Sequence, residues 1–251
     1  MSRAEIIRIG TAAWSIPKPH ADAFPPDGSH LERYAAVFDA VEINTSFYRP
    51  HQRSTYERWA ASVPETFRFA VKMPKAITHE CRLTDCDALL DRFLFEVAGL
   101  GERLGPVLVQ LPPKLAFHEG VSDGFLHALR ARFPGDVVCE PRHASWFTPA
   151  VDALFDELRI ARVAADPAPV AGAGDPAGWP GLVYYRLHGS PRIYYSPYDD
   201  ETLSRIAARL RDDRALGRAV WCIFDNTAAF AATHDALVTR ARAHDPGIDL
   251  R

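Results

Sequence analysis

The feature that most constrains the fold of this chain is a set of eight short runs, each typical of a β-strand, spread along nearly its whole length. The runs cover residues 6–10, 40–44, 67–72, 106–111, 136–140, 160–166, 182–188 and 219–225. In seven of them, charged or amide side chains alternate with apolar ones, and alternate side chains of a strand point to opposite faces of a sheet. The pattern predicts a sheet with one apolar face and one polar face, and a polar centre where the sheet curls.

The segments between these runs show helical spacing. Apolar residues recur three or four positions apart, as at Leu203, Ile206 and Leu210. Eight strands that alternate with helices in 251 residues describe an α/β protein with one domain over residues 1–251, a TIM-type (β/α)8 barrel. In that architecture the active site lies at the C-terminal ends of the strands.

Residues 167–181 interrupt the pattern. They are rich in Pro, Gly and Ala, which disfavour a helix. We therefore expect the sixth helix to be degraded to a loop. This loop is either a plain surface connection or a mobile flap over the site.

The composition limits the classes of partner. Hydrophobic content of 47%, charged content of 24% and a net charge of −3 are ordinary for a globular protein and provide no basic surface, so nucleic acid is an unlikely partner. No run approaches the ~20 apolar residues of a membrane helix, and we expect a cytoplasmic protein without a membrane partner. Four scattered cysteines, Cys81, Cys86, Cys139 and Cys222, are expected to be reduced packing residues. The oligomeric state is left open.

The alternation assigns side chains to faces. If the polar face points inward, the inward residues include Glu42, Lys72, Gln110, Glu140 and Asp166. Their outward neighbours are apolar: Val41, Ile43, Phe69, Val71, Val107, Val109, Val137, Cys139 and Val163. The same phase places three cations lower on the inner face, where each should pair with an inward carboxylate: Arg8, Arg68 and Arg162.

Three clusters at predicted strand ends carry candidate chemistry. The first joins Glu42 and Asn44 to the nearby aromatic Tyr48, and the second joins Glu140 to Arg142 and His143, with Trp146 close by. Glu42 and Glu140 are the candidate general acid and base. The alternative for each is a structural ion pair with a neighbouring arginine.

The third cluster contains Arg186 and His188 on one face of the seventh strand. Together with Lys72 and Arg142, these side chains suit the binding of a phosphate or carboxylate, although pairing inside the barrel is the alternative. At the end of the eighth strand, Asp225 and Asn226 are adjacent and must face opposite ways unless the strand has already ended, so both remain candidates. Aromatic residues that suit the wall of a pocket are Trp14, Tyr48, Trp146, Tyr194, Tyr195 and Tyr198.

No cofactor is predicted. The chain has no G-x-G-x-x-G after a strand, no P-loop and no compact zinc motif. A divalent metal is a possible cofactor, because four residues from successive strands offer oxygen and imidazole ligands: Glu140, Asp166, His188 and Asp225.

Seven segments in order resemble the YecE-like family, the domain of unknown function 72. They are Ile9-Gly10-Thr11 with Trp14, Val41 to Asn44 with Phe47-Tyr48-Arg49, Phe69 to Lys72 leading to Ile77-Thr78-His79, Gln110 to Pro113, Glu140 to His143 with Ser145-Trp146, Arg186 to Gly189, and Phe224 to Thr227. The resemblance implies a barrel fold and supplies no reaction. The chain differs from the family pattern at Ala13, where Gly is more frequent, and at His234, where Asn is usual.

The leading hypothesis is an enzyme that performs acid–base chemistry, as a hydrolase, isomerase or lyase, on a small anionic or sugar-like ligand. A glycoside hydrolase is disfavoured, because the large family of barrel glycosidases takes its acids from strands four and seven, which here end in Gln110 and His188. Two alternatives stay open. One is a metal-assisted barrel enzyme, and the other is a non-catalytic binding protein for an anionic metabolite.

Overall fold

The structure, a computed structural model, describes residues 6–244. Its strands form two sheets. The first has the order β1 (Ile7–Thr11), β10 (Ala219–Phe224), β9 (Leu182–Leu187), β7 (Ala164–Asp166), and all its neighbours are parallel. The second has the order β2 (Ala40–Ile43), β3 (Arg68–Lys72), β4 (Leu104–Gln110), β5 (Val137–Glu140), β6 (Ile160–Arg162), β8 (Ala177–Gly178), and only β8 is antiparallel. All eight predicted strands are present, the sixth as the two pieces β6 and β7.

The edges of the two sheets approach each other at two places. At one, β1 and β2 share a single bridge between Ala12 and Glu42, and the Ala13 amide donates to the Glu42 carbonyl at 2.9 Å. At the other, the chain passes from β6 to β7 through Val163, whose amide donates to Cys139 of β5 at 2.8 Å. Strand pairing does not join the two sheets into one closed barrel. The structure therefore shows a mixed α/β fold with parallel sheets, which is the coarser part of the predicted fold.

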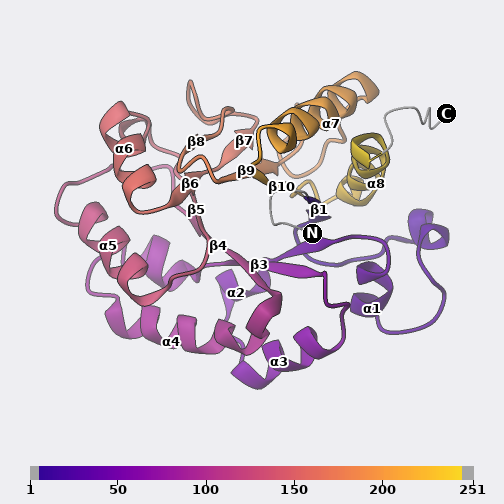
Figure 1. The fold of residues 1–251 in the computed structure, drawn as a ribbon, viewed down its shortest axis with the longest axis horizontal. Coiled ribbons are helices and arrows are strands. Elements are labelled where there is room, and N and C mark those ends of the chain that lie inside the picture. Colours follow the sequence, from indigo (N-terminus) through magenta and orange to yellow (C-terminus); the bar gives the residue numbers. More distant parts are fainter. Residues whose placement is uncertain (1–5, 245–251) are drawn as a thin grey trace.

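The helices lie around the strands (Figure 1). They are α1 (His30–Ala35), α2 (Thr45–Tyr48), α3 (Arg53–Ala61), α4 (Asp87–Val97), α5 (Ser122–Arg132), α6 (Pro149–Glu157), α7 (Asp200–Ala215) and α8 (Ala231–His244), with the short turns η2 (Lys18–Ala23), η4 (Ala98–Arg103), η5 (Ala144–Trp146) and a π-helix, η3 (Ala76–Glu80). Side-chain caps set two of the starts, because Thr148 accepts from the Val151 amide at 3.3 Å and Asp199 from the Thr202 amide at 2.8 Å. Residues 167–181 contain turns and β8 but no helix, as expected. Within residues 6–244, no helix has the length and apolar character needed to span a bilayer.

Apolar side chains fill the space enclosed by the strands. The residues of this inner cluster are Ala12, Ala40, Ala70, Leu108, Val138, Ala161, Val163, Leu182, Tyr184, Ala219, Trp221 and Ile223. Tyr184 stacks on Trp221 with ring centroids 6.0 Å apart. The expectation of a polar centre is therefore wrong for this layer. Charged side chains gather above it, at the carboxyl ends of the strands, where they have each other as partners.

The predicted phase of the sixth run is also wrong. Arg162 points outward, with its Nε 3.4 Å from Asp152 of α6 and its guanidinium 4.7 Å from the centre of the Phe147 ring. Val163 points inward instead. The physical reason is that an outward arginine reaches a carboxylate near solvent, whereas an inward arginine would lie among Ala161, Val138 and their neighbours without one.

Gly10 allows β1 and β2 to approach. A Cβ at this position would lie 1.9 Å from the carbonyl oxygen of Ala40, which is far inside van der Waals contact. The close approach places the end of β1 beside Glu42, and so contributes to the site described next.

Candidate functional site

Arg186 is the centre of a buried charged cluster at the carboxyl ends of the strands. It extends from β9 and is fully buried. Its Nε donates to Glu42 Oε2 at 3.0 Å and its Nη2 to Glu42 Oε1 at 2.8 Å, while Nη1 donates to Glu140 Oε2 at 3.1 Å and Nη2 lies 2.9 Å from Asp225 Oδ2. Three carboxylates from β2, β5 and the end of β10 thus converge on one guanidinium. Breaking such a buried set leaves uncompensated charge.

Both carboxylate oxygens of Glu42 accept hydrogen bonds within this cluster. Besides the three hydrogen bonds from Arg186, its Oε2 accepts from the hydroxyl of Tyr184 at 2.9 Å. Burial, and after it the charge of Glu42, raises the pKa of Tyr184 well above its ordinary value, so this phenol remains a donor. The geometry favours the structural ion pair for Glu42 over the role of general acid or base.

His188 lies between two carboxylates. Its Nδ1 is 3.1 Å from Asp225 Oδ2 and its Nε2 is 3.3 Å from Glu140 Oε1. Burial lowers the pKa of His188, but the charge of Glu140 and the hydrogen bonds to Asp225 and Glu140 outweigh it, so the pKa is raised. Each ring nitrogen thus faces a carboxylate oxygen, an arrangement that favours the protonated imidazole, in which both nitrogens donate.

Glu140 and Asp225 remain ionised. Burial raises the pKa of the Glu140 carboxyl, but Arg186, His188 and Arg142 together hold it well below its usual range. Burial likewise opposes ionisation of Asp225, and Arg186 and His188 reverse that effect. A carboxylate held so firmly in its charged form is a weak proton acceptor.

Lys72, at the end of β3, differs from the other charges of the cluster. It is 6% exposed, and its Nζ lies 4.2 Å from the centre of the Phe47 ring. Among residues 6–244, no carboxylate oxygen lies within ion-pairing distance of Nζ. Burial, and then the positive charge of Arg186, lower the pKa of Lys72 to about 8, although Glu42, Glu140 and Asp225 partly offset them. A buried amine that titrates near neutrality is typical of functional sites.

Arg142 and Tyr194 form the rim of the cluster. Arg142 donates through Nε and Nη2 to Glu140 Oε1, at 3.0 and 2.9 Å, and its side chain is 21% exposed. Tyr194 comes from the segment after β9 and lies edge-on to the His188 ring, with centroids 5.6 Å apart. These two residues lie between the buried charges and the surface.

His79 is a rim residue that the sequence reasoning missed. Its ring lies edge-on to Phe47 at 4.9 Å, and its Nδ1 is 2.8 Å from the Thr78 hydroxyl. Burial lowers the pKa of His79, and the charges of Lys72 and Arg142 lower it further, so a neutral imidazole faces the cations. The available sequence signal was the Ile77-Thr78-His79 match in the family resemblance. The structure adds that His79 lies in a π-helix, a feature frequent at functional sites.

Other predicted residues lie at or near this end of the strands. Gln110 is buried at the end of β4 and donates to the Leu111 carbonyl at 2.7 Å. Asn44 has a buried Oδ1 without a hydrogen-bond partner in the described part of the chain. Tyr48 is 68% exposed, and Trp14 packs edge-on against Trp59 at 5.1 Å. Among residues 6–244, no hydrogen bond, ion pair or ring contact joins Trp14 or Tyr48 to the Arg186 cluster.

Trp146, His143 and Asn226 are structural in this geometry. Trp146 is fully buried, donates to the Leu115 carbonyl at 2.9 Å and stacks with Phe155 at 6.2 Å, so its prediction as a pocket wall is wrong. His143 Nδ1 accepts from the Ser145 amide at 3.2 Å and caps η5. Asn226 points away from Asp225.

Asn226 instead donates to Asp235 Oδ2 at 2.7 Å and to the Ser196 carbonyl at 2.9 Å. The strand β10 ends at Phe224, so both residues follow the strand, and their separate hydrogen bonds direct them to opposite sides. Asp225 is the one that joins the cluster.

The possible metal-ligand set is not assembled. Asp166 lies on the outer side of β7, where its Oδ1 accepts from the Tyr198 hydroxyl at 2.9 Å. Its inclusion with Glu140, His188 and Asp225 is therefore wrong, because the phase of the sixth run is reversed. In the described range, 6–244, no three His, Cys, Asp or Glu side chains are grouped as metal ligands.

The fold and the cluster define a parallel α/β protein with a charged site at the carboxyl ends of its strands. Residues 8–247 match the sequence profile of the family described as Protein of unknown function DUF72, and the chain belongs to this family. The resemblance seen in the sequence is confirmed.

Two curated proteins are similar in sequence to 57% of this chain. The UPF0759 protein YecE of Escherichia coli strain K12 is 34% identical over 143 residues, which cover 57% of this chain and 50% of that protein. The UPF0759 protein YunF of Bacillus subtilis strain 168 is 30% identical over 156 residues, covering 57% and 53%. The chain thus spans about half the length of the curated relatives it matches.

Solved structures share the fold. A DUF72 family protein from Enterococcus faecalis V583 superposes with a TM-score of 0.81 at 22% identity, covering 98% of both chains. One from Thermotoga maritima MSB8 has a TM-score of 0.74 at 23% identity, covering 96% of this chain and all of that one.

Proposed function

We propose that this protein is an enzyme that binds a small anionic or polyhydroxylated substrate at the carboxyl ends of its strands and uses Lys72 to accept a proton from it. In this proposal the two sheets act as one (β/α)8 barrel. The bridge from Ala12 to Glu42 and the continuous backbone through Val163 support that treatment.

One observation carries the proposal, namely the surplus positive charge of the cluster. Its cations are Lys72, Arg142, Arg186 and protonated His188, and its carboxylates are Glu42, Glu140 and Asp225. Four positive charges against three negative ones leave one in excess. Every cation except Lys72 is in contact with a carboxylate, so the excess resides on Lys72. A buried, unpaired cation is costly unless a ligand uses it.

Lys72 also suits proton transfer. An amine with a pKa of about 8 is neutral in an appreciable fraction of molecules near pH 7 and is still basic enough to remove a proton. The charges of Lys72 and Arg142 both act on the imidazole of His79. Proton abstraction next to a carboxylate or carbonyl is the step that isomerases and lyases share. The leading role thereby passes from Glu42 and Glu140 to Lys72.

A thermal-shift screen tests binding. Phosphorylated sugars, carboxylic acids and sugars are added to the wild-type protein, to Lys72→Met and to the control Lys75→Met, whose exposed lysine lies 3.1 Å from Glu80. A ligand of the native state raises the midpoint of unfolding. We expect an anion to raise it in the wild type and in the control and to lose its effect in Lys72→Met. Equal shifts in all three proteins would refute the binding role of Lys72.

Proton transfer is tested separately. Each ligand that binds is incubated in D2O and followed by NMR for incorporation of deuterium at carbon. Lys72→Arg keeps the charge but not an amine that titrates near neutrality, so we expect it to retain binding and lose exchange. Binding without exchange in the wild type would favour the non-catalytic binding protein instead.

A further inference from the structure

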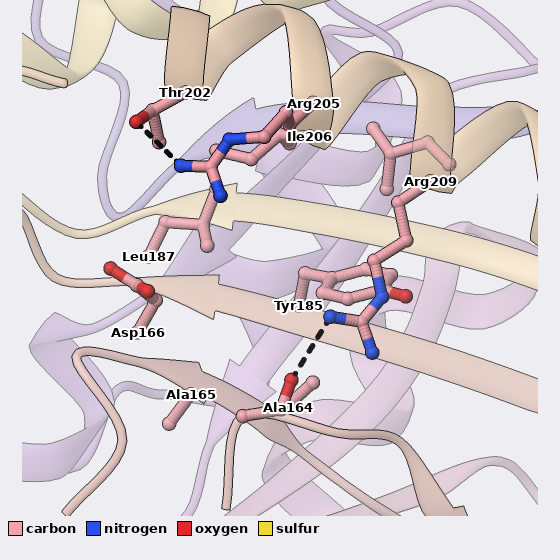
Figure 2. Close-up of a pocket in the computed structure, with 11 residues that line it drawn as sticks. Ala164, Ala165, Asp166, Tyr185, Leu187, Thr202, Arg205, Ile206 and Arg209 are labelled. Atoms are coloured by element: carbon pink, nitrogen blue, oxygen red, sulfur yellow. Dashed lines mark hydrogen bonds between the residues drawn. The ribbon is translucent and has the colours of Figure 1, made fainter. Parts of the chain in front are cut away.

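A second cavity lies on the opposite side of β9 from the charged cluster. Its volume is about 200 Å³, and it is enclosed by α7 on one side and by β7 and β9 on the other (Figure 2). Leu187 contributes to this cavity, whereas its neighbours Arg186 and His188 point into the cluster. The two sites are therefore separated by the strand.

The helix expected after the sixth strand is absent, and its absence explains the space. Residues 167–181 form turns and the short strand β8 instead, and Gly174 is the member of that segment that lines the cavity. The small side chains of Ala164 and Ala165 on β7 leave room beneath α7. The apolar part of the lining consists of Ala164, Ala165, Tyr185, Leu187, Ile206 and Leu210.

Two exposed residues of opposite charge, Arg205 and Asp166, lie at one end of this cavity. Figure 2 shows the guanidinium of Arg205 and the carboxylate of Asp166 on either side of Leu187. Arg205 donates to the Thr202 hydroxyl at 2.9 Å, and Asp166 accepts from the Tyr198 hydroxyl at 2.9 Å. Across the described range 6–244, neither side chain has a partner of opposite charge within ion-pairing distance.

The other arginine of the cavity is already paired. Arg209 donates to Asp175 Oδ1 at 2.8 Å and to the Gly174 carbonyl at 3.3 Å, and its guanidinium lies 5.2 Å from the centre of the Tyr185 ring. It closes the far end of the cavity and leaves Arg205 as the cation available to a ligand.

We infer that this cavity binds a small zwitterion with an apolar body, an α-amino acid of about the size of valine. Arg205 and Thr202 would hold its carboxylate, Asp166 its ammonium group, and the apolar lining its side chain. A plain anion fits less well because Asp166 would repel it. A cavity volume of about 200 Å³ accommodates a ligand of this size.

Isothermal titration calorimetry with L-valine tests the inference. Two matched probes each lack one charge, 3-methylbutanoic acid without the ammonium group and 2-methylpropylamine without the carboxylate. We expect valine to bind with a dissociation constant of about 1 mM or lower, and each single-charge probe to bind at least about tenfold more weakly, a loss of about 1.4 kcal/mol.

Variants locate the binding. Arg205→Ala and Asp166→Asn should each weaken valine binding about tenfold, and Ala164→Leu should abolish it by filling the cavity. The matched control is Arg58→Ala, since Arg58 also donates to a threonine hydroxyl three residues earlier, at 3.5 Å, on α3. Lys72→Met should leave valine binding unchanged.

Three results would overturn the inference. They are the absence of valine binding at ~10 mM, binding of 3-methylbutanoic acid as tight as that of valine, and full binding by Ala164→Leu. None of them depends on whether the strand-end site is catalytic.

Discussion

Replacing Lys72 with methionine should stabilise the protein at neutral pH while removing its anion site. The pKa of Lys72 falls from its ordinary 10.5 to about 8 on folding, and one pKa unit corresponds to about 1.4 kcal/mol. Holding the amine charged therefore costs the folded state about 3 kcal/mol below pH 8. The contact of Nζ with the Phe47 ring at 4.2 Å is lost in the variant, which offsets about 1 kcal/mol. The net expected gain is about 2 kcal/mol.

The stability difference between the wild type and Lys72→Met should depend on pH. Between pH 8 and 10.5 the unfolded lysine binds more protons than the folded one, so the stability contributed by this group in the wild type rises with pH over that window. Lys72→Met lacks the effect. The difference in unfolding free energy between the two proteins should be largest below pH 8 and should disappear toward pH 10.5.

Urea denaturation at pH 7 and pH 10 measures the difference. The control Lys75→Met removes an exposed lysine of the same segment and should change stability by less than about 0.5 kcal/mol. The reasoning is refuted if Lys72→Met is less stable than the wild type at pH 7, or if the difference between the two does not change from pH 7 to pH 10.

Three further outcomes are expected. Arg186→Met leaves three buried carboxylates without their common cation and should lower the unfolding free energy by about 3–5 kcal/mol or more; a urea midpoint close to that of the wild type would contradict its central role. The pKa of His188 is raised on folding, so the stability that it contributes is complete below pH 6.5 and is lost as the pH rises through its folded pKa. The destabilisation by His188→Asn, measured by thermal melts, should therefore be greatest below pH 6.5, and a constant difference at all pH values would argue against a protonated imidazole between Glu140 and Asp225. Ala13 has a φ of 69°, in the region that favours glycine, so Ala13→Gly should raise stability by about 1 kcal/mol; no change in a urea melt would show that this backbone carries no strain.

The resemblance stated from the sequence implies glycine at the position of Ala13, and the positive φ supplies a physical reason for such a preference. The resemblance by sequence thus pointed to a backbone requirement that only the structure makes visible. No comparable account follows for His234, which stacks on His20 at 5.6 Å.

Local pattern was sufficient for the strands and for the loop that replaces the helix expected after the sixth strand. Alternation and the Pro- and Gly-rich composition of residues 167–181 act within a few positions of the chain, so they can be read without a fold. The same alternation assigned Glu42, Lys72, Glu140, Arg186 and His188 to one face. These five side chains do meet in the structure.

Which of these side chains form ion pairs and which remain available to a ligand could be assigned only from the tertiary structure. Glu42 and Glu140 are equivalent in sequence as strand-end acids, but Arg186 reaches both, and a carboxylate that accepts buried hydrogen bonds is no longer free to exchange protons. Lys72 became the leading candidate because it is the cation without a carboxylate partner, a property of the whole cluster and of no single segment.

The sequence by itself determined which segments become strands and which polar side chains follow them, because that information is local. Only the tertiary structure decided the outward turn of Arg162 and Asp166, the burial of Trp146 behind the strands, and the surplus charge at Lys72. Each of these depends on which partners arrive from distant parts of the chain, since the energy of a charge or a large ring is set by what surrounds it in space.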